Sequence, residues 1–226
     1  MPARHAAAPS GPTDPGRDCP LCPRLVDYRL EQRAREPDWH NAPVDTFGDL
    51  GTASLLVVGL APGVSGANRT GRPFTGDYAG NLLYKALLTH GFATGVFDAR
   101  PDDGLTLTGA AVTNAVRCVP PQNKPTGAEI NACRPFLAAT IAAMPKLTVI
   151  LALGRIAHDA VLRTLGERLA AHPFKHGAHH LMDGKPAVAD SYHPSRYNVN
   201  TGVLNEAMLL AVFAEVRRLV DGKRPR

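Results

Sequence analysis

The chain has 226 residues, 44% of them hydrophobic, which is enough for one sizeable α/β core without a second domain. Its 25 Lys and Arg against 20 Asp and Glu give a net charge of +5, and this mild excess permits a polyanionic partner without requiring one. No apolar run is long enough to cross a bilayer. Residues 1–17 lack the apolar core of a secretory signal. We therefore expect a cytoplasmic protein that does not enter membranes.

Composition also divides the chain. Residues 1–17 are rich in Pro, Ala and Gly, which predicts a disordered tail. Residues 18–222 contain every periodic segment and are expected to form a single domain. Residues 223–226 read as a short, solvated basic tail.

Four cysteines are the first candidate site: Cys19 and Cys22 form a CxxC pair, and Cys118 and Cys133 follow about a hundred residues later. Disulfides would require an oxidising compartment, and a thioredoxin-type CxxC would follow a strand, whereas this pair precedes any expected strand. Four thiolates from two distant segments can close a metal site. Zinc and a [4Fe-4S] cluster both fit these ligands.

Four segments have the length and β-branched content of strands, and each precedes a segment with helical periodicity. The expected strands are 54–60, 110–115, 147–153 and 186–192, and the expected helices are 79–90, 126–144, 154–165 and 203–220. Thr126 and Glu129 form a capping box at the start of the second helix. Repeated strand–helix units predict an α/β fold with a mostly parallel sheet and helices on both faces.

Polar loops follow these strands, at the edge of a parallel sheet where ligands bind. The first loop, residues 59–77, has five glycines but neither a Walker A nor a GxGxxG pattern, which disfavours a nucleotide site. Its aromatic residue, Phe74, is either ordinary packing or a platform for a planar ligand, and its place in a polar loop favours the platform.

The later loops offer further candidates. The second loop is stiffened by prolines and presents Asn123 and Lys124, and the last begins at His193. No GxSxG elbow accompanies this histidine, which disfavours a Ser-His-Asp hydrolase. A second group of histidines matches no metal motif and is read as surface or supporting residues: His172, His176, His179 and His180.

Three motifs carry a resemblance to a known family: GLAPG with NRTGRPFTGD, then TNAVRCVPPQNKPT, then HPSRYN. They resemble motifs of the uracil-DNA glycosylase superfamily and, with the four cysteines, its family 5, the iron–sulfur enzymes of type B. The resemblance runs from Cys19 to about residue 220. It implies a monomeric three-layer α/β/α sandwich with a four-stranded parallel sheet and a structural [4Fe-4S] cluster on the cysteines. It also implies hydrolysis of the N-glycosidic bond of uracil, and of other deaminated bases such as hypoxanthine and xanthine, in double-stranded DNA.

The resemblance further implies roles for individual residues. The catalytic residues would be Asp77, Asn123 and His193. The flipped base would be held by Gly59, Ala61, Phe74 and Asn114. The DNA backbone would be gripped by Arg69, Arg72, Lys124, Ser195 and Arg196. These roles fit the chemistry, because an aromatic ring stacks on a base, an amide reads its edge, and a donor stabilises the leaving anion without a covalent intermediate.

Two residues place this chain between two families. Asn114 resembles the uracil-reading asparagine of family 4, whereas Asp77 resembles the acid of family 5. We therefore expect a preference shifted towards uracil over purine substrates. A side chain within residues 196–199 would wedge into the duplex where the base leaves.

Two other classes of function share part of this pattern. A silent nucleic-acid-binding module would keep the cysteines and basic residues, but it would not need Asp77, Asn123 and His193 together at strand ends. A zinc nucleobase deaminase needs an H-x-E motif, and the sequence contains none.

Overall fold

A computed structural model describes residues 13–222. The predicted basic tail and residues 1–12 of the predicted disordered tail lie outside this range. The α-helices are α1 (Pro23–Arg35), α2 (Ala67–Thr70), α3 (Tyr78–Thr89), α4 (Gly127–Ala142), α5 (Arg155–Thr164), α6 (Arg196–Asn200) and α7 (Glu206–Val220). The strands are β1 (Leu55–Gly59), β2 (Ala93–Thr94), β3 (Thr106–Leu107), β4 (Ala110–Asn114), β5 (Val149–Leu153), β6 (His179–His180) and β7 (Ala187–Ser191). Two 3₁₀ turns, η1 (Pro121–Asn123) and η2 (Leu169–Ala171), complete the elements.

The central sheet has the order β4-β1-β5-β7-β6, and its first four strands run parallel. These are the four predicted strands. The sheet has a fifth member, because β6 pairs antiparallel with β7 at one edge. The predicted count of four is therefore short by one. A strand of only two residues carries no alternation that a sequence could reveal.

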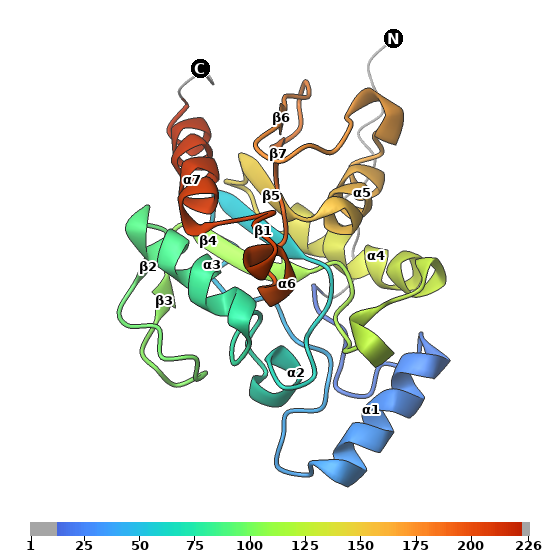
Figure 1. Cartoon of the computed structure of the whole chain (residues 1–226). Coiled ribbons are helices and arrows are strands. Elements are labelled where there is room, and N and C mark those ends of the chain that lie inside the picture. The colour runs from blue at the N-terminus through green and yellow to red at the C-terminus, as the bar shows by residue number, and fades with distance from the viewer. Residues whose placement is uncertain (1–12, 223–226) are drawn as a thin grey trace.

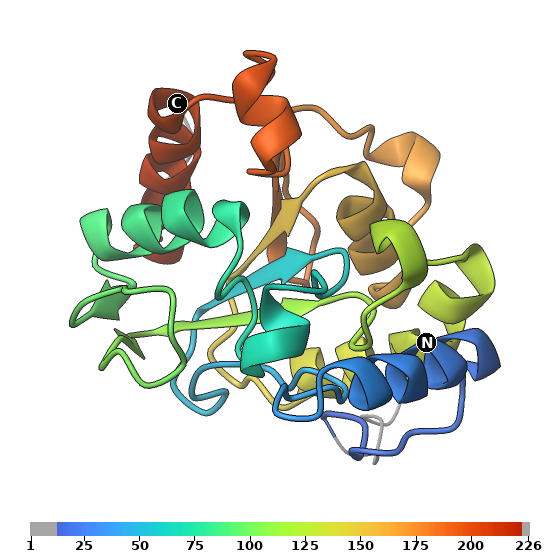
Figure 2. The same cartoon turned by 60° about the horizontal axis from the view of Figure 1, so that its bottom comes forward.

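Helices cover both faces of this sheet, as Figures 1 and 2 show. Successive strand residues point to opposite faces, so Leu55 and Val57 pack beneath α3 and α7. Leu56 and Val58 pack beneath α4 and α5 on the other face. All five residues of β1 are buried, which explains its continuous apolar sequence. The predicted α/β fold with layered helices is confirmed.

The helix starts follow local capping chemistry. The Thr126 hydroxyl accepts the N–H of Glu129 at 3.3 Å, and the Glu129 carboxylate accepts the N–H of Thr126 at 2.7 Å. The predicted capping box is thus present. α7 begins three residues later than predicted, because Asn205 caps it by accepting the N–H of Met208.

The ordered fold begins before residue 18. Asp14 forms an ion pair with the fully buried guanidinium of Arg117, Oδ1 to Nη1 2.8 Å, and accepts the N–H of Thr46 at 2.9 Å. The predicted tail boundary at residue 17 is therefore too late. A single acidic residue in a Pro- and Gly-rich segment gave no sign of a partner 103 residues away.

Helix α1 lies beside η1 and α4. Figure 2 shows it in blue alongside the yellow-green ribbon of those elements. Arg24 at its start binds the Glu129 carboxylate at 2.8 Å. Within residues 13–222, none of the helices combines the length and apolarity needed to span a bilayer.

Candidate active site

A pocket of about 370 Å³ lies where β1, β4 and β7 end. Its size suits a small planar ligand. Of the residues that the sequence identified, it brings together Ala61, Phe74, Asp77, Asn114, Asn123, His193, Ser195 and Arg196. The other predicted site residues, Gly59, Arg69, Arg72 and Lys124, do not line it.

Gly59 shapes the back of the pocket. It ends β1 opposite Asn114 in the parallel register with β4. A Cβ at Gly59 would lie 2.4 Å from Asn114 Oδ1 and 2.4 Å from Phe74 Cζ. Only glycine leaves room for the side chains of Asn114 and Phe74 at this point. Gly59 therefore acts by lacking a side chain.

Asn114 presents an unused acceptor. The residue is 3% exposed, and within the described chain its Oδ1 has no hydrogen-bond partner. Leaving a buried polar atom unpaired costs about 1–3 kcal/mol, and such exceptions in a pocket point to a ligand that completes the bond.

Phe74 is held in a strained backbone conformation. Its φ is +53°, which is unusual for a bulky residue and is typical of functional sites. The Tyr84 hydroxyl donates to the carbonyl of Pro73 at 2.7 Å and fixes the preceding residue. Gly80 lets the Phe74 carbonyl approach α3, since a Cβ there would lie 1.8 Å from that oxygen. The ring therefore takes a set position in the pocket wall.

Asp77 is both a helix cap and a pocket residue. Its Oδ1 accepts the N–H of Gly80 at 3.2 Å at the start of α3. On its other side a Cβ at Gly66 would lie 2.5 Å from Oδ2. Burial raises the pKa of Asp77, although the backbone N–H groups of Ala79 and Gly80 oppose that rise. A carboxylate in this setting can orient water or offset a developing cation.

His193 follows β7 and faces Phe74 across the pocket. The two ring centroids are 6.0 Å apart, with 32° between the planes. The Asn198 amide donates to the His193 carbonyl at 2.8 Å and fixes the turn. Burial lowers the pKa of His193 to about 4, so the ring is neutral at neutral pH and carries one N–H donor.

Asn123 reaches the pocket from an exposed turn. Both Gln122 and Asn123 have φ of +56°, a left-handed conformation that asparagine tolerates. Arg24 anchors the turn, because its Nη2 donates to the carbonyl of Lys124 at 3.0 Å while also binding Glu129. The amide of Asn123 is thereby held at the mouth of the pocket.

The basic residues divide into two groups. Arg69, Lys124 and Arg196 are exposed, and the Arg196 guanidinium lies 5.5 Å from the ring centre of Tyr78 in the pocket wall. The Ser195 hydroxyl caps α6 by accepting the N–H of Asn198 at 3.3 Å. Ser195 and Arg196 line the pocket, whereas Arg69 and Lys124 lie outside its lining.

Arg72 is buried and does not belong to the exposed basic residues near the pocket. It is 5% exposed, and its guanidinium binds both carboxylate oxygens of the buried Asp103 at 2.8 and 2.7 Å. It also packs among the rings of Phe47, Tyr84 and Phe97. The expectation that Arg72 contacts a phosphate is therefore wrong. Its partner lies 31 residues along the chain, beyond the reach of sequence reasoning.

The four cysteines converge away from the pocket. Cys19 and Cys22 precede α1, Cys118 follows β4, and Cys133 lies on α4; all four are free thiols. They line one apolar recess with Leu25, Val116 and Phe136. Burial raises the pKa of Cys22 to about 11 and that of Cys118 to about 12, so an added positive charge is needed to hold thiolates here.

The sulfur spacing bears on the kind of metal. Among residues 13–222, three metal-ligating atoms lie within 4.8 Å of one another only at His158, His180 and Asp190. No three of the cysteine sulfurs come that close. A tetrahedral zinc with bonds of about 2.3 Å would hold four sulfurs roughly 3.8 Å apart. Within the described residues, the sulfurs are therefore not arranged as in a tetrahedral zinc site.

Sequence reasoning missed a buried network behind β7. The Asp190 carboxylate binds His158 Nδ1 at 2.7 Å and His180 Nε2 at 2.9 Å. The other nitrogen of His158 contacts the His172 carbonyl at 2.8 Å. His180 and His172, read from sequence as surface or supporting residues, thus flank the strand that leads to His193. The position of Asp190 on β7, three residues before His193, was the signal that the sequence offered.

A layered α/β fold with a base-sized pocket at the carboxyl ends of its strands defines the class. The chain belongs to the uracil DNA glycosylase superfamily, whose family model matches residues 46–217. Within it, the chain is 46% identical to a type-5 uracil-DNA glycosylase of Thermus thermophilus over 207 residues, 89% of this chain and 93% of that protein. It is 42% identical to a type-5 uracil-DNA glycosylase of Pyrobaculum aerophilum over 200 residues, 87% of this chain and 86% of that protein.

A type-4 uracil-DNA glycosylase of Pyrobaculum aerophilum is 38% identical, but over only 116 residues, half of each chain. The resemblance to the type-5 proteins is therefore the more extensive, and the predicted family is confirmed.

Proposed function

We propose that this protein is a monofunctional uracil-DNA glycosylase, which hydrolyses the N-glycosidic bond of uracil in double-stranded DNA and leaves an abasic site. The observation that carries the proposal is the buried, unpaired Oδ1 of Asn114, which shares one pocket with Phe74, Asp77 and His193. Family membership supports the reaction class. A silent DNA-binding module would have no use for a desolvated acceptor in such a pocket.

The target base has to leave the helical stack before it can be held. Phe74, fixed in the pocket wall, is the proposed stacking surface. Asn114 offers an acceptor to the N3–H of uracil and an N–H donor to O4. This amide supports uracil as the preferred base, with hypoxanthine and xanthine as weaker substrates, because it resembles the uracil-reading asparagine of family 4.

Cleavage transfers the electron pair of the glycosidic bond to N1 of uracil. The neutral ring of His193 donates an N–H to O2 and stabilises the leaving anion. The Asp77 carboxylate orients a water that adds to C1′, and it accepts the proton that this water loses. Asn123 positions the nucleotide at the mouth of the pocket. Solvent then protonates the uracil anion, so no covalent enzyme intermediate forms.

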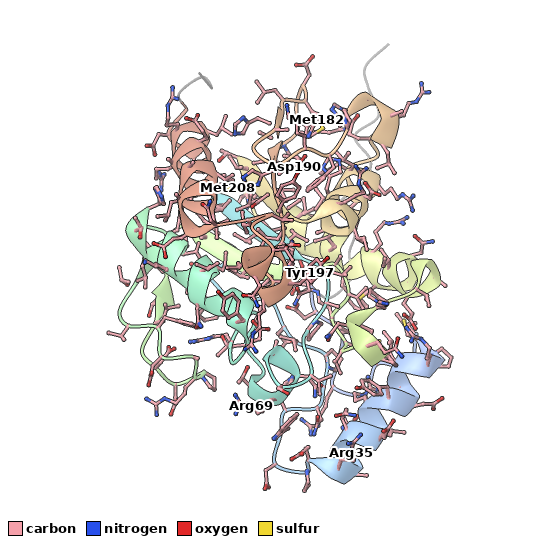
Figure 3. The ribbon with its side chains drawn as sticks, in the orientation of Figure 1. Arg35, Arg69, Met182, Asp190, Tyr197 and Met208 are labelled. Atoms are coloured by element: carbon pink, nitrogen blue, oxygen red, sulfur yellow. The ribbon has the colours of Figure 1, made fainter. Side chains whose placement is uncertain are left out.

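The DNA backbone is proposed to lie across the exposed side chains of Arg69, Lys124 and Arg196, which fix its register. Tyr197, labelled on α6 in Figure 3, is 73% exposed beside the pocket. Its large ring at the mouth makes it the proposed wedge that fills the gap left by the extruded base. All these residues come from one chain, which supports action as a monomer, and the proposed place of action is the cytoplasm.

The four cysteines are proposed to hold a [4Fe-4S] cluster. The supporting observations are the all-thiol donor set, the apolar recess and a sulfur arrangement unlike that of a tetrahedral zinc site. The cluster would supply no step of the hydrolysis. It would tie α1 to the loop after β4 and to α4.

The test is cleavage of end-labelled duplexes carrying one uracil, with alkali to break abasic sites. The wild-type protein should cut, while Asp77→Asn and His193→Ala should lose most activity and still bind DNA. Asn200→Ala, in an exposed residue of α6, serves as the matched control and should cut normally. If the wild-type protein bound DNA but did not cut it, the glycosylase proposal would be refuted in favour of a DNA-binding module.

A further inference from the structure

Arg29 of α1 is buried beside the cysteines without an acidic partner. It is 3% exposed. Its Nη1 lies 3.7 Å from Cys118 Sγ, and its Nη2 donates to the carbonyl of Cys19 at 3.2 Å. Within residues 13–222, its Nε has no hydrogen-bond partner. The guanidinium therefore directs its charge at the thiol recess.

A second buried arginine shows how this fold neutralises such a charge elsewhere. Arg117 is fully buried, but it pairs with Asp14 at 2.8 Å and also binds Thr46 and Thr140. Near Arg29, Asp18 pairs instead with Arg33 at 2.7 Å and is 70% exposed. A desolvated cation is costly unless an anion compensates it. No described carboxylate lies within ion-pair distance of Arg29, and Asp18 acts on it only from further away.

The cysteines can supply that anion only as thiolates. Four thiolates around an iron–sulfur core leave an excess of negative charge, and the charge and hydrogen bonds around such a core set its reduction potential. The Arg29 guanidinium beside Cys118 Sγ supplies both a positive charge and a hydrogen-bond donor.

We propose that Arg29 is the counter-charge of the cluster site, raising the reduction potential of the cluster and slowing its loss. The inference rests on the proposed [4Fe-4S] cluster. Removing a nearby positive charge destabilises the more negative, reduced form more than the oxidised form. The potential must then become more negative, whereas a purely packing role for Arg29 would leave it unchanged.

The experiment compares wild type, Arg29→Met, Arg29→Lys and Arg33→Met as cluster-loaded proteins. Iron and acid-labile sulfide are measured first, so that a wild type without a cluster refutes the cofactor proposal rather than the role of Arg29. Midpoint potentials are then measured by film voltammetry, and iron release to a chelator is timed. Arg33 lies one turn along the same helix, pairs with Asp18 and provides the matched control.

The expected result is a more negative potential and faster iron release for Arg29→Met. Arg29→Lys should stay close to wild type because it keeps the charge, and Arg33→Met should match wild type. An Arg29→Met potential equal to that of the wild type would overturn the proposal. If Arg29→Met does not retain a cluster, the test rests on Arg29→Lys. An iron-release rate near that of the wild type in Arg29→Lys would support the role of the positive charge. Loss of the cluster from Arg29→Lys as complete as from Arg29→Met would refute that role.

Discussion

The carboxylate of Asp77 accepts the backbone N–H of Gly80 at 3.2 Å, so one side chain both starts α3 and faces the pocket. The cap fixes one oxygen. The other lies against Gly66, where no Cβ could fit. The acid is thus oriented by the helix that follows it and by the loop that precedes it.

Asp77→Asn should separate catalysis from folding. Asparagine also caps helices well, so α3 should form, while activity on uracil should fall by about 10²–10⁴ with the loss of the acid–base group. Burial raises the pKa of Asp77, so its ionisation costs stability as pH rises through that pKa. The variant should melt at or above the wild-type temperature at neutral pH, with the difference vanishing in acid.

Activity at several pH values and thermal unfolding test this expectation. Asp49→Asn is the control, since Asp49 is exposed and caps a distant turn. Full activity in Asp77→Asn would remove the acid from the mechanism.

Asn114→Ala should change which base is cut. The substitution removes the buried acceptor and donor that meet uracil, and one lost hydrogen bond to a buried partner costs about 1–3 kcal/mol, roughly 5–150-fold in rate. We expect uracil cleavage to fall by that factor while hypoxanthine cleavage changes less. Parallel single-turnover assays on the two duplexes measure the ratio. Equal losses on both bases would contradict the uracil-reading role.

Lys124→Ala and Arg196→Ala should weaken DNA binding without selecting among bases. Each exposed cation that meets a phosphate contributes about one unit to the salt dependence of the binding constant. Affinity for an undamaged duplex, measured from low to moderate salt, should show a slope reduced by about one in each variant. An unchanged slope would place that residue outside the DNA path.

His158 should make stability depend on pH. Burial opposes its charge, but the hydrogen bond and charge of Asp190 outweigh burial and raise its pKa. Stability from the protonated ring is full below about pH 6.5, the ordinary value, and is lost as pH rises through the raised folded pKa. Thermal unfolding of wild type should show this decline, and His158→Asn should lack it. Parallel profiles for the two proteins would show that the ring carries no such proton.

The sequence was sufficient to predict the four parallel strands and the edge that carries the site, because burial on both faces leaves continuous apolar runs such as Leu55–Gly59. It also located Asn114 at the end of a recognisable strand, and Asp77 and His193 in loops that follow such strands. It could not reveal β6, which is two residues long. Nor could it separate the buried Arg72 from the exposed Arg69, because burial depends on Asp103, 31 residues away. The same limit hid the His158–Asp190 pair.

Helix α1, which follows the CxxC pair, contacts both the turn that carries Asn123 and the cysteine recess. Arg24 at its start grips the carbonyl of Lys124 and the carboxylate of Glu129, and so steadies the turn that presents Asn123. Arg29, further along the helix, touches Cys118. Oxidative damage to the thiols would therefore release the far rim of the pocket as well. Loss of the proposed cluster would therefore be expected to lower activity through Asn123, although the cluster takes no part in the hydrolysis.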